Sequence, residues 1–371
     1  MRIAMIISTP FPPEEGIGFY VYNLSKKLIE RGHEITVITR GSIKTQNEVL
    51  EGINIIKVPF LPLYPFHVQF HGYFVNRMFN SIKNEFDIVH IHTPLTPPLK
   101  TSLPIITTIH GSMLGNAKDI EIVDLKSLGT KFLTKYISYS LVSQLIISSS
   151  GITTVSNSVK TELKEYYFLN NVSVVGNGVD EEKFVPSNEK GNYILYVGRL
   201  SYGKGLFDLL KIAKEIVKDH DIHFCLVGKG ELEKKLKKII KKEKLDNNVK
   251  LLGSLKHDEL IKIYQKAKLF LFPSYYEGFP TVVLEAMSSG VPVLVSDIEA
   301  HKNFITDGKD GILIKKGSID DASQKISYLL NNPDLMDKLG KNARITIEMK
   351  FSWNEISKIF EEIYFKTVNG G

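Results

Sequence analysis

Two glutamates frame the start of an apolar helix predicted in the second half of the chain. Glu277 stands in the tight loop YYEGF, which follows the apolar run KLFLFPS, and Glu285 lies one to two turns into the helix predicted after that loop. A carboxylate accepts several hydrogen bonds, which suits the vicinal diol of a ribose. The spacing places one acid at the carboxyl end of a strand and one in a helix, and it leaves open that Glu285 is a partly exposed helix carboxylate.

The predicted helix also offers main-chain N–H groups at its start. Pro280 fits the first helical position, where its missing N–H costs nothing, and Gly290 ends the helix. The N–H groups around Phe279 and Thr281 have no helical partner and suit a phosphate. One loop and one short helix are therefore predicted to hold a sugar, a phosphate and a ribose in a row.

Two basic residues flank a glycine turn after another apolar strand, in the segment GRLSYGKG. Arg199 and Lys204 stand where the next helix begins, so an arginine fork and a lysine ammonium converge on a helix N-terminus. This combination suits a diphosphate. The alternative is a pair of solvated loop cations, but the chain has only six arginines, and one directly after a strand favours function.

Two glycines follow the first apolar strand, in the segment PFPPEEGIGFY. Gly16 and Gly18 let the backbone approach a ligand closely, and a helix N-terminus follows, which together suit a phosphate. By itself this pattern is more typical of an ordinary loop. It also lacks the third glycine of the dinucleotide-binding fingerprint.

The elements that carry these residues alternate between short apolar strands and amphipathic helices. Near-continuous apolar strands separated by helices predict parallel sheets covered on both faces. The pattern restarts around the polar segment 181–193, which we interpret as a linker. The fold class is therefore α/β, with two Rossmann-like, doubly wound domains facing across a cleft, and ligands are expected at the carboxyl ends of the strands.

The predicted domains are an acceptor-side domain over 1–185 and a donor-binding domain over 190–350. The tail FSWNEISKIFEEIYFKTV predicts a final amphipathic helix within 352–371, which is a candidate to pack back on the first domain. A charge-free tract over 136–159 carries eight serines, so a buried helix running into a strand is favoured over a membrane span.

Composition is typical of a globular protein, with 371 residues, 43% hydrophobic and 24% charged. The single cysteine, Cys225, excludes an internal disulfide and fits a reducing compartment. The net charge is +6, but the densest basic run, 229–250, has helical periodicity and no arginine, so a solvated helix face is favoured over a nucleic-acid site. We expect a cytoplasmic protein that binds no nucleic acid.

Several blocks together resemble family 4 glycosyltransferases, which are retaining enzymes with the GT-B fold. The run EGFPTVVLEAMSSGVPVLVSD is similar to the family's two-glutamate motif, and YVGRLSYGKG, DIVHIHT, TTIHG and VVGNGVDEEKF are similar to other blocks. The resemblance covers nearly the whole chain. Glu15 departs from the glycine that many members have, which concerns only the flexibility of the Gly16 loop, and Pro280 stands at a position that the family varies.

The resemblance implies a role for each matching residue. Glu285 is expected to hold the donor ribose, and Arg199 and Lys204 to neutralise the donor diphosphate with help from the Gly16 loop. Glu277 is expected beside the hydroxyls of the transferred sugar. His110, at the end of PIITTIHG, is expected near the reacting carbon and the acceptor, although the sequence alone favours a capping or core histidine. His90 and His92 are kept as structural or acceptor-side residues.

The resulting hypothesis is a retaining glycosyltransferase that moves a sugar from a nucleotide-diphosphate sugar to a hydroxyl acceptor, which is a glycan, a lipid-linked molecule or a small molecule. No acidic pair accompanies the basic residues of the predicted diphosphate site, so we expect no metal and no other cofactor. The stretch 64–86 is aromatic and mildly basic, which suits either a plain acceptor-side helix or peripheral contact with the inner face of a membrane.

Three alternatives remain open. A nucleotide-sugar 2-epimerase uses the same fold, but the two-glutamate block argues against it. A non-catalytic nucleotide-sugar binding module is disfavoured by the complete set of donor residues. A nicotinamide-dependent dehydrogenase is the weakest, because VGKGEL lacks the glycine spacing and the downstream acid.

Overall fold

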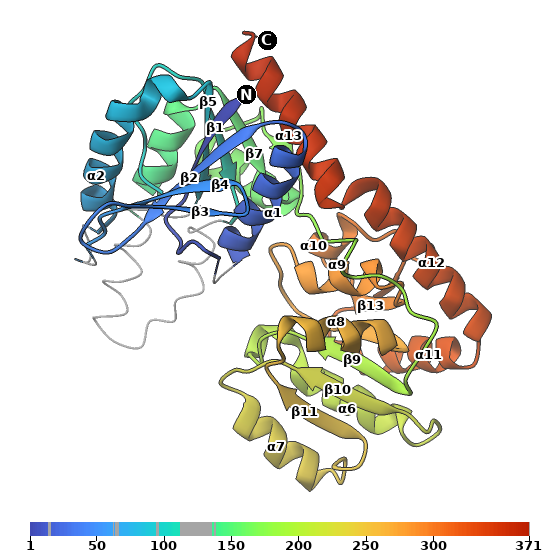
Figure 1. Cartoon of the computed structure of the whole chain (residues 1–371). Coiled ribbons are helices and arrows are strands. Elements are labelled where there is room, and N and C mark those ends of the chain that lie inside the picture. The colour runs from blue at the N-terminus through green and yellow to red at the C-terminus, as the bar shows by residue number, and fades with distance from the viewer. Residues whose placement is uncertain are drawn as a thin grey trace. The chain divides into compact units, whose positions relative to one another are not determined.

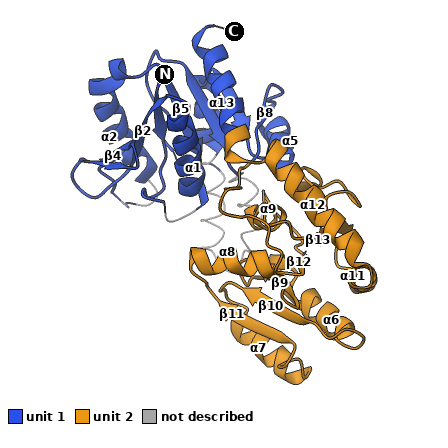
Figure 2. Ribbon diagram, turned by 45° about the vertical axis from the view of Figure 1, so that its right-hand side comes forward, with its two compact units in different colours: residues 1–176, 356–371 blue, residues 177–355 orange. Residues whose placement is uncertain are grey.

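The chain folds into two compact units. The computed structural model describes residues 1–13, 16–61, 63, 67–93, 96–111, 136 and 139–370. The first unit comprises Met1–Gly176 and Ile356–Gly371, and the second comprises Asn177–Glu355 (Figure 2). Glu15 and the stretch 64–66, on which two sequence-based expectations fall, lie outside the described residues.

The first unit contains a sheet whose described strands run in the order β3-β4-β2-β1-β5-β6-β7-β8 (Figure 1). All neighbours are parallel except β3 and β4, which are antiparallel. Successive strands add on one side of β1 and then, from β5, on the other. The strands are β1 (Arg2–Ile6), β2 (Glu34–Arg40), β3 (Gln46–Leu50), β4 (Ile53–Val58), β5 (Ile88–Thr93), β6 (Ile105–Ile109), β7 (Gly151–Thr154) and β8 (Ser173–Val174).

Amphipathic helices cover this sheet. They are α1 (Gly16–Glu30), α2 (His67–Ile82), the short η1 (Lys83–Glu85), the described helical residues 139–148, α5 (Asn157–Tyr167) and the C-terminal α13 (Trp353–Val368). Tyr364 of α13 is fully buried and its hydroxyl lies 2.6 Å from Nδ1 of His90, while Glu361 pairs with Arg31 and His33. The last helix of the chain therefore packs on the first unit.

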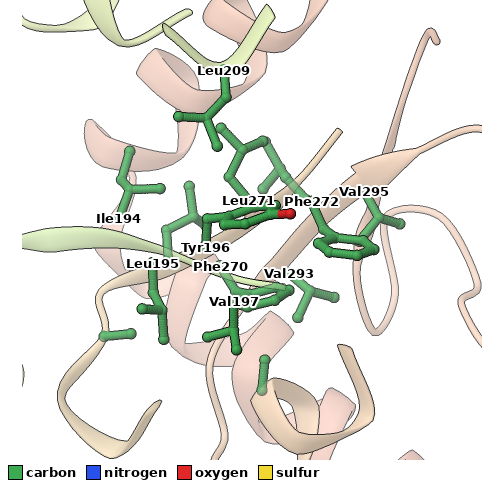
Figure 3. Packing of buried hydrophobic residues seen from close by; sticks show 14 of the residues in the cluster. Ile194, Leu195, Tyr196, Val197, Leu209, Phe270, Leu271, Phe272, Val293 and Val295 are labelled. Carbon is green, nitrogen blue, oxygen red and sulfur yellow. The ribbon is translucent and has the colours of Figure 1, made fainter. Parts of the chain in front are cut away.

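The second unit contains a sheet in which every described strand is parallel to its neighbours, in the order β11-β10-β9-β12-β13-β14. Its strands are nearly free of polar residues because both faces are buried. Figure 3 shows Tyr196 of β9 beside Phe270 and Phe272 of β12, and the rings of Tyr196 and Phe272 stack 5.6 Å apart. The strands are β9 (Tyr193–Val197), β10 (His223–Val227), β11 (Val249–Gly253), β12 (Leu269–Phe272), β13 (Val293–Ser296) and β14 (Ile312–Ile314).

The helices of the second unit follow the predicted amphipathic segments. The lysine-rich α7 buries Leu236 and Ile240 and keeps its lysines at the surface, as its periodicity predicts. The helices are the short η2 (Tyr202–Lys204), α6 (Leu206–Ile216), α7 (Glu233–Lys242), α8 (His257–Lys266), α9 (Thr281–Ser288), α10 (Glu299–Lys302), α11 (Ile319–Leu330) and α12 (Pro333–Lys350).

The chain leaves the first unit earlier than the predicted linker. The change falls between Gly176 and Asn177, whereas the sequence predicts it within 181–193. The boundary is earlier because the residues just after Gly176 pack against 352–353. Val179 forms a β-bridge with Ser352, and a Cβ on Gly178 would lie 2.5 Å from the ring of Trp353. Phe184 joins the core of the second unit as well.

One strand, β3, has no counterpart in the sequence-based expectations. It is an antiparallel edge strand whose residues are mostly exposed, so it lacks the apolar run by which the other strands are identified. Within the described residues, no helix combines the length and the apolarity needed to cross a bilayer.

Candidate active site

The strand order of the second unit marks a site at its carboxyl edge. β9 and β12 are neighbours, but β10 follows β9 on one side and β13 follows β12 on the other. At such a switch point the connections diverge and leave room for a ligand. Arg199 lies just beyond β9, and Glu277 lies on the loop that leaves β12. Two of the predicted residues therefore belong to this point.

Lys204 and Glu277 form an ion pair there. Nζ of Lys204 lies 2.6 Å from Oε1 of Glu277, and the two side chains are 24% and 8% exposed. Gly205 makes this possible, because a Cβ on it would lie only 1.9 Å from the carbonyl oxygen of Pro273, and its φ is +67°. The glycine thus lets η2 touch the end of β12.

Tyr275 also stabilises the contact between η2 and the loop after β12. Its main-chain N–H donates to the carbonyl of Gly203 at 2.9 Å, and its hydroxyl donates to the carboxylate of Asp208 on α6. The loop after β12 is therefore tied to both η2 and the helix that follows it. These contacts of Gly205 and Tyr275 hold Lys204 and Glu277 in place.

The electrostatics of the pair favour an anionic ligand. Burial raises the pKa of Glu277, and the Lys204 ammonium opposes that shift. An ammonium has three donors, so Lys204 keeps donors for other oxygens while it holds Glu277. Arg199 is exposed, and its guanidinium makes no ion pair or hydrogen bond to any described residue. Its positive charge is therefore available to a ligand.

The helix after Glu277 begins one residue later than predicted. Pro280 has a ψ of 94°, which is not helical, so it is the N-cap and Thr281 is the first residue of α9. Phe279 packs between the rings of Phe304 at 5.5 Å and Phe351 at 6.4 Å. These contacts hold the start of α9 in place, and the first-turn N–H of Thr281 has no intrahelical partner.

Glu285 is the fifth residue of α9 and is half-buried. Its Oε2 atom is fully buried and makes no hydrogen bond to any described residue, and the same holds for the neighbouring Tyr264 hydroxyl. Burial raises the pKa of Glu285 to about 7, and the Tyr264 hydroxyl, which lies close to the carboxylate without a well-aligned hydrogen bond, lowers it by less. A buried carboxylate oxygen without a well-formed hydrogen bond is costly unless a ligand satisfies it.

The structure adds one residue to this region that the sequence did not indicate. His301 on α10 is fully buried, Nδ1 lies 2.7 Å from the carbonyl oxygen of Ser296, and its ring lies 6.0 Å from Phe272. Burial lowers its pKa to about 4, so the ring is neutral at pH 7. The carbonyl requires a proton on Nδ1, and Nε2 is a buried acceptor with no hydrogen bond within the described part of the chain. No motif distinguishes this histidine.

The two glycines of the first unit have different environments. Gly16 is the first residue of α1, and a Cβ there would meet nothing within 4 Å. Gly18 lies inside the helix and is buried, where a Cβ would come within 3.1 Å of Pro13 and 3.3 Å of the Pro10 carbonyl oxygen. Gly18 therefore serves the packing of α1 on the preceding loop, whereas Gly16 alone keeps the open approach that a phosphate needs.

His110 follows β6 as part of a histidine cluster. Its Nε2 lies 3.0 Å from Nδ1 of His92, and its ring meets Tyr20 edge-on at 4.5 Å. Burial lowers the pKa of His110 to about 3, so the imidazole is neutral. Because Nε2 is used by His92, Nδ1 is the ring nitrogen of His110 that no other described residue engages.

Behind this pair the cluster continues into the core. Nε2 of His90 lies 2.6 Å from the hydroxyl of Thr108, Nδ1 of His90 lies 2.6 Å from the hydroxyl of Tyr364, and the rings of His90 and His92 are 3.9 Å apart. From the sequence, His92 is expected to be a structural or acceptor-side residue. Its hydrogen bond to His110 now makes it a neighbour of the candidate catalytic group.

Two family models match the chain and together span most of it. The model described as "Glycosyltransferase Family 4" matches residues 15–183, and the model described as "Glycosyl transferases group 1" matches residues 179–346. An uncharacterized glycosyltransferase of Methanocaldococcus jannaschii is 26% identical over 98% of this chain and 98% of that protein.

Solved structures share the same fold over the full length. Sucrose-phosphate synthase from Thermosynechococcus elongatus superposes with a TM-score of 0.78 at 18% identity, covering 100% of both chains. A protein of Anabaena solved in complex with UDP and glucose superposes with a TM-score of 0.72 at 16% identity, covering 98% of this chain and 99% of that one.

These likenesses confirm the predicted GT-B fold, with two Rossmann-like parallel-sheet domains. They also confirm that the chain is an enzyme of the glycosyltransferase class. The chain belongs to glycosyltransferase family 4, as its two-glutamate block and its Arg199–Lys204 block indicate.

Proposed function

We propose that this glycosyltransferase uses a nucleoside-diphosphate sugar, holds the nucleotide on its second unit, and transfers the sugar with retention of anomeric configuration. The observation that carries the proposal is the switch point between β9 and β12, which holds the Lys204–Glu277 pair and Arg199, whose side chain pairs with no described residue. The cations of Arg199 and Lys204 suit a diphosphate, and the carboxylate of Glu277 suits the hydroxyls of the sugar attached to it.

The proposed mechanism depends on where negative charge develops as the sugar is transferred. As the bond from the anomeric carbon to the diphosphate oxygen breaks, negative charge grows on the leaving diphosphate. Arg199 and Lys204 meet that charge in a preorganised arrangement, which is usually the largest catalytic term. Glu277, held by Lys204, accepts hydrogen bonds from the sugar hydroxyls. The diphosphate itself can take the proton of the acceptor hydroxyl on the same face, which leads to retention.

Glu285 is proposed to bind the ribose of the donor. Its Oε2 atom has no hydrogen bond among the described residues and is an acceptor for a ribose hydroxyl, and the first turn of α9 lies next to it for a phosphate oxygen. The Anabaena structure, solved with UDP and glucose, supports uridine as the first base to test.

A thermal-shift screen tests the donor proposal directly. One of the uridine, guanosine and adenosine diphosphate sugars is expected to raise the melting temperature, because a ligand that binds only the folded state stabilises it. A panel in which no diphosphate sugar shifts the transition at millimolar concentration would remove the donor site. Incubation of the donor without acceptor, followed by a search for an epimer, separates transfer from 2-epimerisation.

We propose that the reaction needs no metal ion, since two cationic side chains already face the diphosphate position. The enzyme is therefore expected to keep its initial rate in excess EDTA. Loss of the rate on chelation and its return with magnesium or manganese would show that the cations of the chain are insufficient.

His92 is expected to position His110 for the reacting sugar. The change His92→Phe removes the hydrogen bond to Nε2 of His110, and we expect kcat to fall about ten-fold while the donor KM stays unchanged. His92→Asn retains a hydrogen-bonding group near the lost Nδ1 and is the matched control, expected to keep most of the rate. A folded His92→Phe variant with the kcat of the wild type would contradict this role.

The acceptor is proposed to bind the first unit, as a glycan, a lipid-linked molecule or a small hydroxyl compound. A cytoplasmic location is proposed on the single Cys225, which fits a reducing compartment. Peripheral contact with the inner face of a membrane is proposed for the case of a lipid-linked acceptor.

A further inference from the structure

A cavity of about 710 Å³ lies on the first unit, and the described residues that line it include none of the histidine cluster. One wall is α2, the other is the helical segment that includes 139–148, and the loop 96–100 lies between them. Its volume is within the range of sites for small ligands. Figure 1 shows α2 at the edge of this unit.

The loop that lines this cavity is fixed to α2. Nδ2 of Asn76 donates to the carbonyl of Pro98 at 3.1 Å, and its Oδ1 accepts from the main-chain N–H of Lys100 at 2.7 Å. A Cβ on Gly72 would come within 2.8 Å of Pro97, so only glycine lets the loop approach the helix this closely. The cavity is therefore preformed, which lowers the entropic cost of binding.

The lining chemistry is cationic, aromatic and amide-rich. Arg77 and Lys100 are both exposed, and neither side chain forms an ion pair with a described residue. Tyr73 and Tyr136 are 61% and 63% exposed, and Asn80 and Gln144 add amide groups. No acidic side chain occurs among the lining residues that the structure describes. Tyrosine faces suit the apolar face of a sugar ring, amides suit its hydroxyls, and the two cations suit an anionic group.

These groups are ordered along the cavity by the topology. α2 starts after the carboxyl end of β4 and leads back toward the start of β5, and the segment 139–148 leads to the start of β7. α2 therefore runs from the carboxyl edge of the sheet to the opposite edge, and the segment 139–148 ends at that opposite edge. Tyr73 and Tyr136 lie toward the carboxyl edge, where His110 follows β6, and Arg77 and Gln144 lie further along.

We propose that this cavity binds an acidic oligosaccharide, with a sugar ring on the tyrosines and a carboxylate or sulfate group on Arg77 and Lys100. The bound sugars are the part of the acceptor glycan remote from the hydroxyl that receives the new residue. This identification as acceptor rests on the proposed transfer to a hydroxyl, whereas binding itself does not depend on it.

The test is calorimetric titration of the full chain, without donor, by acidic tetrasaccharides: an oligogalacturonate, a glucuronate-containing and a sulfated one, with maltotetraose as the neutral control. At least one acidic probe is expected to bind ten-fold more tightly than maltotetraose. The double change R77Q and K100Q is expected to weaken that probe at least ten-fold, and Tyr73→Ala about five-fold. Lys164→Gln, an exposed lysine on α5 of the same unit, is the matched control and is expected to change nothing.

Two results would overturn the proposal. One is the absence of specific acidic binding, seen either as no preference for any acidic probe over maltotetraose or as equal binding by the R77Q and K100Q variant. The other is that phosphatidylglycerol vesicles bind in an Arg77-dependent manner while all oligosaccharides fail, which would make the surface a membrane contact. Because donor binding is measured separately by thermal shift, failure here is distinguishable from failure of the proposed transfer reaction.

Discussion

Replacing Arg199 or Lys204 with alanine is expected to lower kcat/KM for the donor by about 10²–10³-fold. Each change removes a cation from the place where the leaving diphosphate gains charge, and removing one preorganised donor of this kind costs about 3–4 kcal/mol in other enzymes. Arg199 is exposed and pairs with no described side chain, so its loss leaves the fold intact. Steady-state kinetics with a melting curve for each variant provide the measurement.

Lys204 needs a further control because it also neutralises Glu277. Lys204→Ala leaves a buried carboxylate without its partner, so the variant loses stability as well as rate. The double variant Lys204→Met with Glu277→Gln removes both charges; we expect it to recover stability but not kcat. Lys262→Ala, an exposed lysine on α8, is the matched surface control. Near-normal turnover in folded Arg199 and Lys204 variants would exclude the diphosphate role.

Glu285→Gln is expected to raise the donor KM about 10–100-fold with a smaller effect on kcat. A hydrogen bond to a charged group is worth about 1.5–3 kcal/mol, and a ribose contact acts alike in the ground and transition states. The pKa of Glu285 is near 7, and the ionised carboxylate is the form that accepts from two hydroxyls. The kcat/KM of the wild type should therefore decrease as the pH is lowered below 7, and the kcat/KM of Glu285→Gln should show no such decrease.

Stability gives a second readout of the same carboxyl group. Its pKa is about 7 in the folded protein against 4.5 as the ordinary value, so the folded state holds the proton more tightly. The wild type should lose stability relative to Glu285→Gln as the pH rises from 4.5 to 7, by about 3 kcal/mol. An unchanged donor KM together with parallel stability curves would remove Glu285 from the donor site.

The sequence predicts the parallel strands and the residues at their carboxyl ends because both depend on local patterns. It does not predict the Lys204–Glu277 ion pair, since those residues are 73 positions apart and meet only because β12 lies next to β9. The same limit applies to His92 and His110, which end neighbouring strands.

Local geometry explains the remaining differences. Pro280 is compatible with either the first helical position or the N-cap, and its ψ of 94° identifies it as the N-cap of α9. Gly18 shares a motif with Gly16, yet its place inside α1 gives it a packing role. His301 approaches the site only through the short helix after β13, which no periodicity reveals because it has four residues.

The most direct test of the central claim is proton NMR of the sugar that the enzyme releases or transfers from an α-linked nucleoside-diphosphate donor. Spectra recorded within the first minutes, before the free sugar mutarotates, are expected to show the α-anomer, and the glycosidic bond of a transfer product is expected to be α. A β-configured sugar would show inversion, and it would contradict both the same-face mechanism at the diphosphate and the role assigned to Glu277.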